Sequence, residues 1–345
     1  MIADLNTLYD GFRASMKGSS WKEEPQRFEI DFLSEMVRIK HEIKDGTYRT
    51  SDPVEFTLNE RGKIRYIHGG RMRDRVVRHA LCDTELGPKL AKYLIYNNGA
   101  SQKGKGLSFA RAQFEKDMHN FWLKHRTNDG YVGFVDLSKF YDNIQHEKIK
   151  SAIYPYISDE ARQLMDEVLR GFRVDVTYMS DEEYARCMDE KFNSVEYFSK
   201  YPKEIRKEWG KPRKYMDKSV EIGDQVSQNI GIFFPTPIDN YVKIVKGCKW
   251  YGRYMDDMYV ICKTREEVQH ILNGIRVQAE KIGLYMNEKK THIVKLSDSF
   301  MFLQTKYSLT ETGKVIKRIN PKNVVRERRK LKAYKRLLDR GAMKY

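Results

Sequence analysis

The stretch that decides the fold is Trp250-Tyr251-Gly252-Arg253-Tyr254-Met255-Asp256-Asp257-Met258-Tyr259-Val260-Ile261-Cys262. Aromatic and apolar runs flank an adjacent pair of acids, which is typical of a β-hairpin with Asp256 and Asp257 at or beside its turn. Neighbouring carboxylates repel, and between hydrophobic strands they resist ionising together. A divalent metal held by oxygen ligands is the usual means of offsetting that repulsion. A simple polar turn explains the pair equally well, because aspartate is common in turns.

A second segment favours the metal site over the polar turn. An apolar, strand-prone run that begins at Tyr131 ends at Asp136, and the residues after it turn toward a helix. An acid at a strand end and an acid pair on a hairpin can bring three carboxylates together at one sheet edge. Two metal ions roughly 4 Å apart need such a cage for phosphoryl transfer, because they clamp the attacking and the leaving oxygen.

Composition indicates a partner class but no reaction. The 345 residues allow two or three lobes with an ample core. They include 64 lysine and arginine residues against 48 acidic ones, which gives a formal net charge of +16. Such an excess is typical of proteins with a polyanionic partner, although an ordinary basic surface has the same composition. Four scattered cysteines predict free thiols. With no signal peptide and no long apolar run, we expect a cytoplasmic protein without a membrane partner.

The two acidic motifs together resemble the palm domain of reverse transcriptases. The residues that carry the resemblance are Tyr254-Met255-Asp256-Asp257 and the upstream Asp136-Leu137-Ser138-Lys139-Phe140-Tyr141-Asp142-Asn143-Ile144. The likeness covers nearly the whole chain, and its order and spacing are most similar to the bacterial and phage enzymes of diversity-generating retroelements. Group II intron, retron and abortive-infection reverse transcriptases are related to these. The resemblance implies an α+β right-hand polymerase fold with fingers, a palm containing an antiparallel sheet, and a short helical thumb.

Lobe boundaries follow from the resemblance and from local composition. N-terminal helices and fingers are expected over residues 1–130, and the palm over 131–310. Within the palm, residues 172–218 read as a helical insertion, whose interleaved aromatic and basic residues either bury a small satellite core or stack on single strands. The chain returns to the fingers near 221–235. Residues 311–345 are expected to form a basic thumb helix, and whether this thumb is complete stays open.

The resemblance also assigns roles to individual residues. Asp136, Asp256 and Asp257 are implied as catalytic metal ligands, and Lys290 as the general acid that protonates the leaving pyrophosphate, with Lys289 as the alternative. Tyr141 matches the steric gate, an aromatic ring that leaves no room for a 2′-hydroxyl, although such a residue is otherwise an ordinary core aromatic. The remaining implied contacts are Lys63, Arg65, Ile222, Gly223 and Gln228 for the incoming nucleotide, Phe302 and Leu303 for the primer grip, and Arg73, Lys105, Arg326, Arg329 and Lys330 for the template–primer backbone.

Two positions depart from the family pattern. Ile222 precedes a glycine where retron and group II intron enzymes normally carry glutamine, and an aliphatic side chain cannot hydrogen-bond the incoming nucleotide. We therefore expect weaker control of pairing geometry and lower fidelity. Gln304 follows Phe302-Leu303 where the family usually has glycine, which changes the turn but leaves the role of the strand intact.

The implied activity is RNA-templated DNA synthesis with two Mg²⁺ ions, for which Mn²⁺ can substitute. The implied partners are a structured RNA template, a DNA or RNA primer, dNTPs, and a small basic helical accessory protein. Three functions stay open from sequence alone. They are a retroelement polymerase that copies its own RNA into mutated cDNA, a phage-defence enzyme of the abortive-infection type, and a non-catalytic nucleic-acid-binding scaffold.

Overall fold

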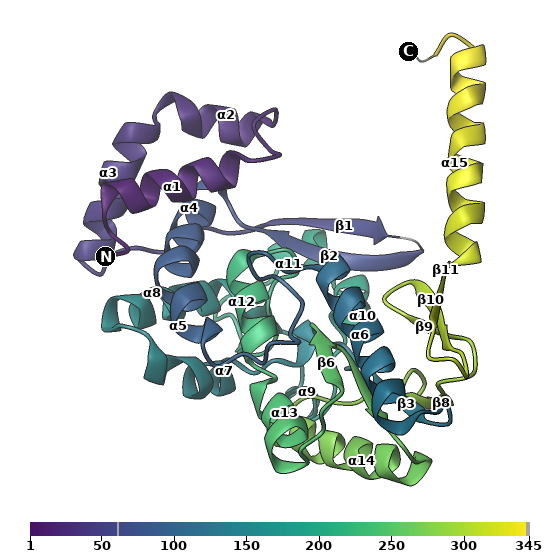
Figure 1. Cartoon of the computed structure of the whole chain (residues 1–345). Coiled ribbons are helices and arrows are strands. Elements are labelled where there is room, and N and C mark those ends of the chain that lie inside the picture. The colour runs from purple at the N-terminus through teal and green to yellow at the C-terminus, as the bar shows by residue number, and fades with distance from the viewer. Residues whose placement is uncertain (61, 343–345) are drawn as a thin grey trace. The chain divides into compact units, whose positions relative to one another are not determined.

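The structure is a computed structural model, and it describes residues 1–60 and 62–342 (Figure 1). The chain divides into two compact units. The first comprises residues 1–96, 137–241 and 275–287, and the second comprises residues 97–136, 242–274 and 288–345. The fingers, palm and thumb boundaries expected from the sequence cut the chain differently and stay predictions. Across the described residues, no helix has both the length and the apolar composition that a membrane crossing requires.

The second unit is built on a four-stranded antiparallel sheet in the order β6-β7-β3-β8. Its strands are β3 (Tyr131–Val135), β6 (Tyr251–Tyr254), β7 (Asp257–Cys262) and β8 (His292–Lys295). The predicted hairpin is confirmed: Tyr254 pairs with Asp257, so Met255 and Asp256 form the two-residue turn between β6 and β7. Met255 has a φ of 57°, the left-handed conformation that tight hairpins use. The buried Arg253 guanidinium donates to the Met255 carbonyl at 3.2 Å and holds this turn.

Alternation along β3 gives the sheet two apolar faces. On one face Phe134 packs against Phe114 of α6 (Leu107–His125), with ring centroids 6.1 Å apart. On the other face Gly133 lets α14 (Arg265–Lys281) approach closely, because a Cβ there would lie 2.5 Å from Val268. A sheet covered on both faces is rigid, which suits residues that must be held at its edge.

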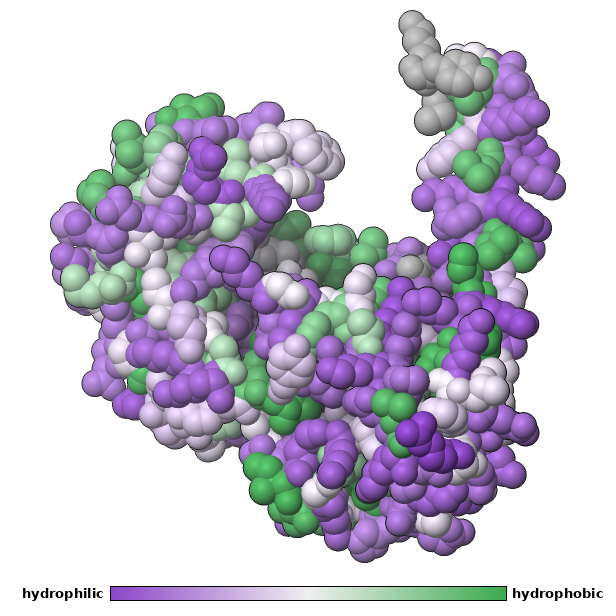
Figure 2. Space-filling model, viewed as in Figure 1, coloured by the Kyte–Doolittle hydropathy of each residue, from purple (hydrophilic) through white to green (hydrophobic). Residues whose placement is uncertain are grey.

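A second, three-stranded sheet in the order β11-β10-β9 packs on the α6 side of this core. Its strands are β9 (Phe300–Phe302), β10 (Thr305–Leu309) and β11 (Val315–Ile319). The chain then enters α15 (Pro321–Asp339), which lies within the residues 311–345 expected to form a basic helix. Asn320 caps it by accepting from the Lys322 amide at 3.0 Å. Figure 1 shows α15 in yellow as a single helix beyond β11. All of α15 lies within the described residues, and none of its side chains is buried. Figure 2 shows the visible face of this helix as mostly hydrophilic, with a few hydrophobic residues.

The first unit contains the N-terminal helices and a fingers-type hairpin. The hairpin consists of β1 (Val54–Glu60) and β2 (Lys63–Gly69), paired in antiparallel register. The helices of this unit outside the insertion are α1 (Leu5–Met16), α2 (Glu23–Ile30), α3 (Phe32–Lys44), α4 (Met72–Leu81), α5 (Gly87–Ala91), α7 (His146–Ile153), α8 (Asp159–Phe172), α12 (Gln225–Phe233) and α13 (Thr236–Asn240). Short turns are η1 (Cys82–Leu86), η2 (Tyr141–Asn143) and η3 (Tyr154–Tyr156), while η4 (Tyr241–Val245) and α14 run from one unit into the other.

Residues 172–218 form a small core of their own. The segment contains α9 (Asp181–Asp189), α10 (Ser194–Lys200), α11 (Lys203–Lys207) and the short strands β4 (Val174–Asp175) and β5 (Tyr215–Met216). Its buried cluster includes Phe192, Tyr197, Phe198 and Trp209, so the prediction of helices around a satellite core is confirmed. The buried Lys218 ammonium donates to three carbonyls at the end of α9, and burial lowers its pKa to about 8.

Candidate active site

Strand register brings two of the predicted acids together. Asp136 directly follows β3 and Asp257 begins β7. The ladder pairs Val135 with Met258, so one further step of the same antiparallel register sets Asp136 opposite Asp257. Facing residues of such strands have Cβ atoms about 4.5–5.5 Å apart. Both residues line one cavity of about 290 Å³, the acid pocket, whose walls also include Lys290, Met301, Phe302 and Leu303.

The same register accounts for the lysine. β3 pairs with β8 on its other side, Phe134 facing His292, and two further steps set Lys290 opposite Asp136. The Lys290 Nζ donates to Asp136 Oδ1 at 2.5 Å. The Asp136 side chain is only 13% exposed, and partial burial strengthens this ion pair because screening by water is reduced. Lys290 thus supplies at Asp136 the positive charge that the sequence led us to expect from a metal. Lys289, the alternative lysine, also lines the pocket.

The third acid, Asp256, lies in the turn between β6 and β7. The described residues that line the acid pocket do not include Asp256, which sits in the β6–β7 turn. Nor do the described parts of the chain contain any group of three or more His, Cys, Asp or Glu side chains placed to hold a metal ion. The three-carboxylate cage stays a prediction, and Asp136 and Asp257 are the two of its acids that line one pocket. This pair, hard carboxylate oxygens in a half-buried pocket, fits the ligand chemistry of Mg²⁺.

The primer-grip residues belong to the same pocket. Phe302 pairs with Thr305, so Leu303 and Gln304 form the turn between β9 and β10, with φ values of 44° and 65°. Two successive left-handed residues without glycine are strained by about 1 kcal/mol or more each. Arg111 of α6 steadies this turn by donating from Nε and Nη2 to the Leu303 carbonyl, at 3.1 and 2.5 Å. Sequence reasoning missed Arg111, because nothing in the pattern of residues 107–125 distinguishes it from other helical arginines.

In the first unit, Tyr141, the predicted steric gate, lies beside the loop that holds Ile222 and Gly223, two residues predicted to contact the incoming nucleotide. The Tyr141 carbonyl accepts a hydrogen bond from the Val220 amide at 3.1 Å, and the Ile144 carbonyl accepts from the Ser219 amide at 2.9 Å. These bonds place η2 alongside the segment that continues into Ile222 and Gly223. Gly223 has a φ of 93°, a conformation that glycine adopts without strain. Tyr141 itself is half-buried.

A buried charge cluster anchors this loop. Arg78 of α4 donates from Nη1 to Glu221 and to Asp224, at 2.8 Å each. The three side chains are 3%, 2% and 8% exposed, respectively. One guanidinium cannot neutralise two buried carboxylates, and burial, reinforced by Asp224, raises the pKa of Glu221 to about 8. These two acids flank Ile222-Gly223 in the sequence, a signal that the sequence reasoning did not use.

The other residues predicted to contact the nucleotide or the template–primer differ in their exposure and in their bonding partners. The Lys63 side chain lies outside the described part of the structure. Arg65 is half-buried on β2, with its Nε 3.2 Å from the Glu60 carboxylate, and Gln228 is half-buried on α12. Arg73 forms an ion pair with Glu42 and lies over the Tyr48 ring at 5.1 Å, so a phosphate contact would have to compete with both.

The predicted backbone contacts of the second unit lie on a loop and on α15. Lys105 donates from Nζ to the Asn98 carbonyl at 3.2 Å, and partial burial lowers the pKa of this lysine. Arg326, Arg329 and Lys330 are exposed on α15. These positions are accessible to a nucleic-acid backbone, and their roles stay predictions.

Comparisons with known proteins identify the fold and the family. A telomerase from Candida albicans, solved in complex with a TWJ fragment of telomeric RNA, has a similar fold, with a TM-score of 0.50 and 11% sequence identity. The likeness covers 80% of this chain and 46% of the telomerase chain, so the present chain spans less than half of that protein. No curated protein sequence matches the chain. Residues 59–307 match the family described as reverse transcriptase (RNA-dependent DNA polymerase). That match takes in the strands of the acid pocket, and the chain belongs to the reverse transcriptase family of nucleotidyltransferases.

Proposed function

We propose that this chain copies an RNA template into cDNA by two-metal-ion nucleotidyl transfer. The observation that carries the proposal is the row formed by Asp257, Asp136 and Lys290 across three adjacent strands. Two carboxylates and an ammonium at one sheet edge are what phosphoryl transfer requires, because charge must be neutralised on both sides of the reacting phosphorus. Family membership supports the same reaction.

In this mechanism Asp136 and Asp257, together with Asp256 from the β6–β7 turn, would hold Mg²⁺. When bound, the ions supply activation of the primer 3′-oxygen and neutralise charge on the triphosphate. The primer oxygen forms a bond to the α-phosphorus as the bond to pyrophosphate breaks. Lys290 holds a proton at Nζ and donates it to the leaving pyrophosphate oxygen. Asp136 keeps this ammonium beside the reacting phosphates until then.

The other residues of the proposal select the incoming nucleotide and position the primer and the template. The Tyr141 ring excludes a 2′-hydroxyl, so deoxynucleotides are favoured. Ile222 and Gly223 lie against the new base pair, and Gln228 and Arg65 contact the incoming nucleotide. The Leu303 turn positions the primer end, since it lines the acid pocket together with Asp257. The basic residues of α15 follow the template–primer backbone.

For the biological role, we propose a diversity-generating retroelement in a bacterium or phage. Ile222 supports this role, because an aliphatic residue there gives up a hydrogen bond to the incoming nucleotide and lowers fidelity. The partners are then a structured RNA, a primer and a small basic accessory protein. An abortive-infection enzyme of phage defence is the second candidate, since the same aliphatic residue resembles some of those enzymes.

The reaction is tested by extension of an oligo(dT) primer on poly(A) with labelled dTTP and Mg²⁺. We expect the wild type to extend the primer and Asp256→Ala to lose extension while still binding the template–primer. Failure of the correctly folded wild type to extend any primer would favour a non-catalytic scaffold. Sequencing the RNA and DNA that co-purify with both proteins separates the retroelement role from the defence role, because only the former predicts cDNA of one repeated RNA.

A further inference from the structure

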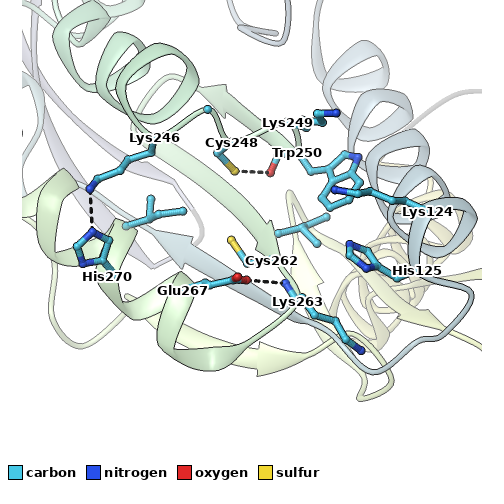
Figure 3. A pocket seen from close by; sticks show the side chains of 13 residues that line it. Lys124, His125, Lys246, Cys248, Lys249, Trp250, Cys262, Lys263, Glu267 and His270 are labelled. Carbon is cyan, nitrogen blue, oxygen red and sulfur yellow. Dashed lines mark hydrogen bonds between the residues drawn. The ribbon is translucent and has the colours of Figure 1, made fainter.

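A cavity of the second unit lies at the other end of the β6–β7 hairpin, away from Asp257. It has a volume of about 370 Å³ and is lined by residues next to the ends of β6 and β7 and by α6 and α14. We call it the lysine pocket, and its main lining residues are Lys124, Lys246, Lys249, Lys263, Trp250 and His270 (Figure 3). Cys262 in its wall ends β7, whereas Asp257 begins that strand, so the two sites are separated by its length, about 17 Å at ~3.4 Å per residue.

The lining of the lysine pocket is mostly positively charged. Its lining holds four lysines and one glutamate, a formal net charge of +3. The glutamate, Glu267, is already used at the start of α14, where it accepts from the backbone amides of Lys263 and Thr264 at 3.1 and 3.2 Å. Figure 3 shows the lysines distributed around the cavity and not along one wall. A site of this kind attracts an anion and can contact it from several directions.

The histidine adds a donor. Lys246 donates from Nζ to His270 Nε2 at 2.7 Å, so Nε2 acts as the acceptor and the imidazole is neutral, with its proton on Nδ1. The Nδ1 proton makes the His270 ring a further hydrogen-bond donor among the lining residues.

One wall is aromatic. Trp250 is half-buried and packs edge-on against Phe121, with ring centroids 5.3 Å apart. This contact with the core residue Phe121 holds the Trp250 ring in place. The Lys124 ammonium lies over the Trp250 ring, 5.5 Å from its centroid. A nucleobase can replace this flexible ammonium, because base–aromatic stacking is a stronger contact than an exposed cation–π pair. The displaced ammonium is then close to the phosphate of the same nucleotide.

We propose that the lysine pocket binds a nucleotide unit, with its base on Trp250 and its phosphate among the lysines. The volume is in the range of small-ligand sites, and both recognition elements are on the walls. The unit is either a free mononucleotide or one nucleotide of a single strand bound to the protein, and the chemistry of the contacts is the same. The site is independent of the polymerase reaction, because it shares no residue with the acid pocket.

Two cysteines in the walls provide a local readout. Cys248 and Cys262 both line the pocket, and Figure 3 shows their sulfur atoms facing one another. A hydrogen bond from Cys262 lowers the pKa of the Cys248 thiol, which makes Cys248 the more reactive of the two. Mass spectrometry measures how fast iodoacetamide alkylates each cysteine. The rate without ligand is compared with the rate in the presence of AMP, of a short single-stranded RNA, or of inorganic phosphate. Cys187 lies in the satellite core of residues 172–218 and serves as internal control.

We expect AMP or the RNA to slow alkylation of Cys248 and Cys262 several-fold and to leave Cys187 unchanged. Protection by AMP identifies a free-nucleotide site, and protection by RNA alone identifies a site for a strand. Lys246→Glu/Lys249→Glu should lose the protection, whereas the charge-matched Lys17→Glu/Lys44→Glu, on exposed positions of the first unit, should keep it. With RNA, the double variant should also weaken the salt dependence of protection. The slope of the logarithm of the RNA-binding constant against the logarithm of the salt concentration should fall in magnitude by about 0.7 for each lysine–phosphate ion pair that is removed.

Two results would overturn the proposal. One is equal protection by inorganic phosphate and AMP, which would leave no role for the base. The other is unchanged alkylation with all three probes. Asp256→Ala separates this site from the proposed function, since it should abolish primer extension and retain protection of Cys248. Loss of both properties in that variant would show that the two sites are not independent.

Discussion

Replacing Glu221 with glutamine should remove a pH dependence that the wild-type fold carries. Glu221 and Asp224 share the single buried guanidinium of Arg78, and Glu221 Oε1 is a buried oxygen for which the described residues offer no hydrogen-bond partner. Burial therefore raises the pKa of this carboxyl from 4.5 to about 8. Glutamine has the same shape and no charge, and its amide oxygen can still accept from Arg78.

The sign of the effect follows from proton binding in the two states. Below pH 4.5 the folded and unfolded forms both keep the proton, so Glu221 contributes no slope. Between pH 4.5 and about 8 the unfolded chain releases the proton while the folded protein retains it, so stability falls as pH rises. One proton corresponds to about 1.4 kcal/mol per pH unit. Between about pH 6 and pH 7, the wild type should lose up to about 1.4 kcal/mol of unfolding free energy relative to Glu221→Gln.

The assay is urea unfolding of both proteins at these two pH values, followed by circular dichroism. The difference between their slopes isolates Glu221, because all other titrating groups are common to both. Glu182→Gln, at an exposed position of α9, is the matched control and should keep the wild-type slope. Identical slopes for Glu221→Gln and the wild type would refute the reasoning, as would a wild type that gains stability over this interval.

Three further substitutions test the β9–β10 turn, the loop around Ile222 and the predicted steric gate. Gln304→Gly should raise the free energy of unfolding by about 1 kcal/mol, because glycine relieves the left-handed strain at a φ of 65°; an unchanged urea midpoint would contradict this. Ile222→Gln should lower misincorporation in a single-nucleotide extension assay by restoring a hydrogen bond near the base pair, and an unaltered error frequency would oppose that role. Tyr141→Ala should narrow the preference for dNTPs over rNTPs, measured as a ratio of kcat/KM values, and a preserved preference would remove Tyr141 as the gate.

The hairpin and the identity of its acids could be predicted from sequence because the signal is local. Alternating apolar residues around Asp256-Asp257 specify two strands and a turn, and the structure has them where expected. The helix after Asn320-Pro321 was predictable for the same reason, since cap and first-turn residues are adjacent in the chain. Local patterns fix local structure.

The arrangement of the site could not be predicted in the same way. That Lys290 faces Asp136 depends on β8 pairing with β3, a long-range choice that no single segment encodes. That Asp136 and Asp257 line one pocket depends on the pairing of β3 with β7. Arg111 reaches the Leu303 carbonyl only because α6 packs beside the β9–β10 turn. Each of these is a consequence of tertiary packing.

The most direct test of the central claim maps where a metal ion binds. Fe²⁺ in place of Mg²⁺, with ascorbate and hydrogen peroxide, generates hydroxyl radicals that cut the backbone next to the bound ion. The account predicts cuts on both sides of the site, beside Asp136 and beside Asp256-Asp257, which excess Mg²⁺ suppresses and Asp136→Asn weakens at both places. Cuts beside only one of these segments, or cuts that Asp136→Asn leaves unchanged, would show that the two strands do not share an ion and would contradict the account.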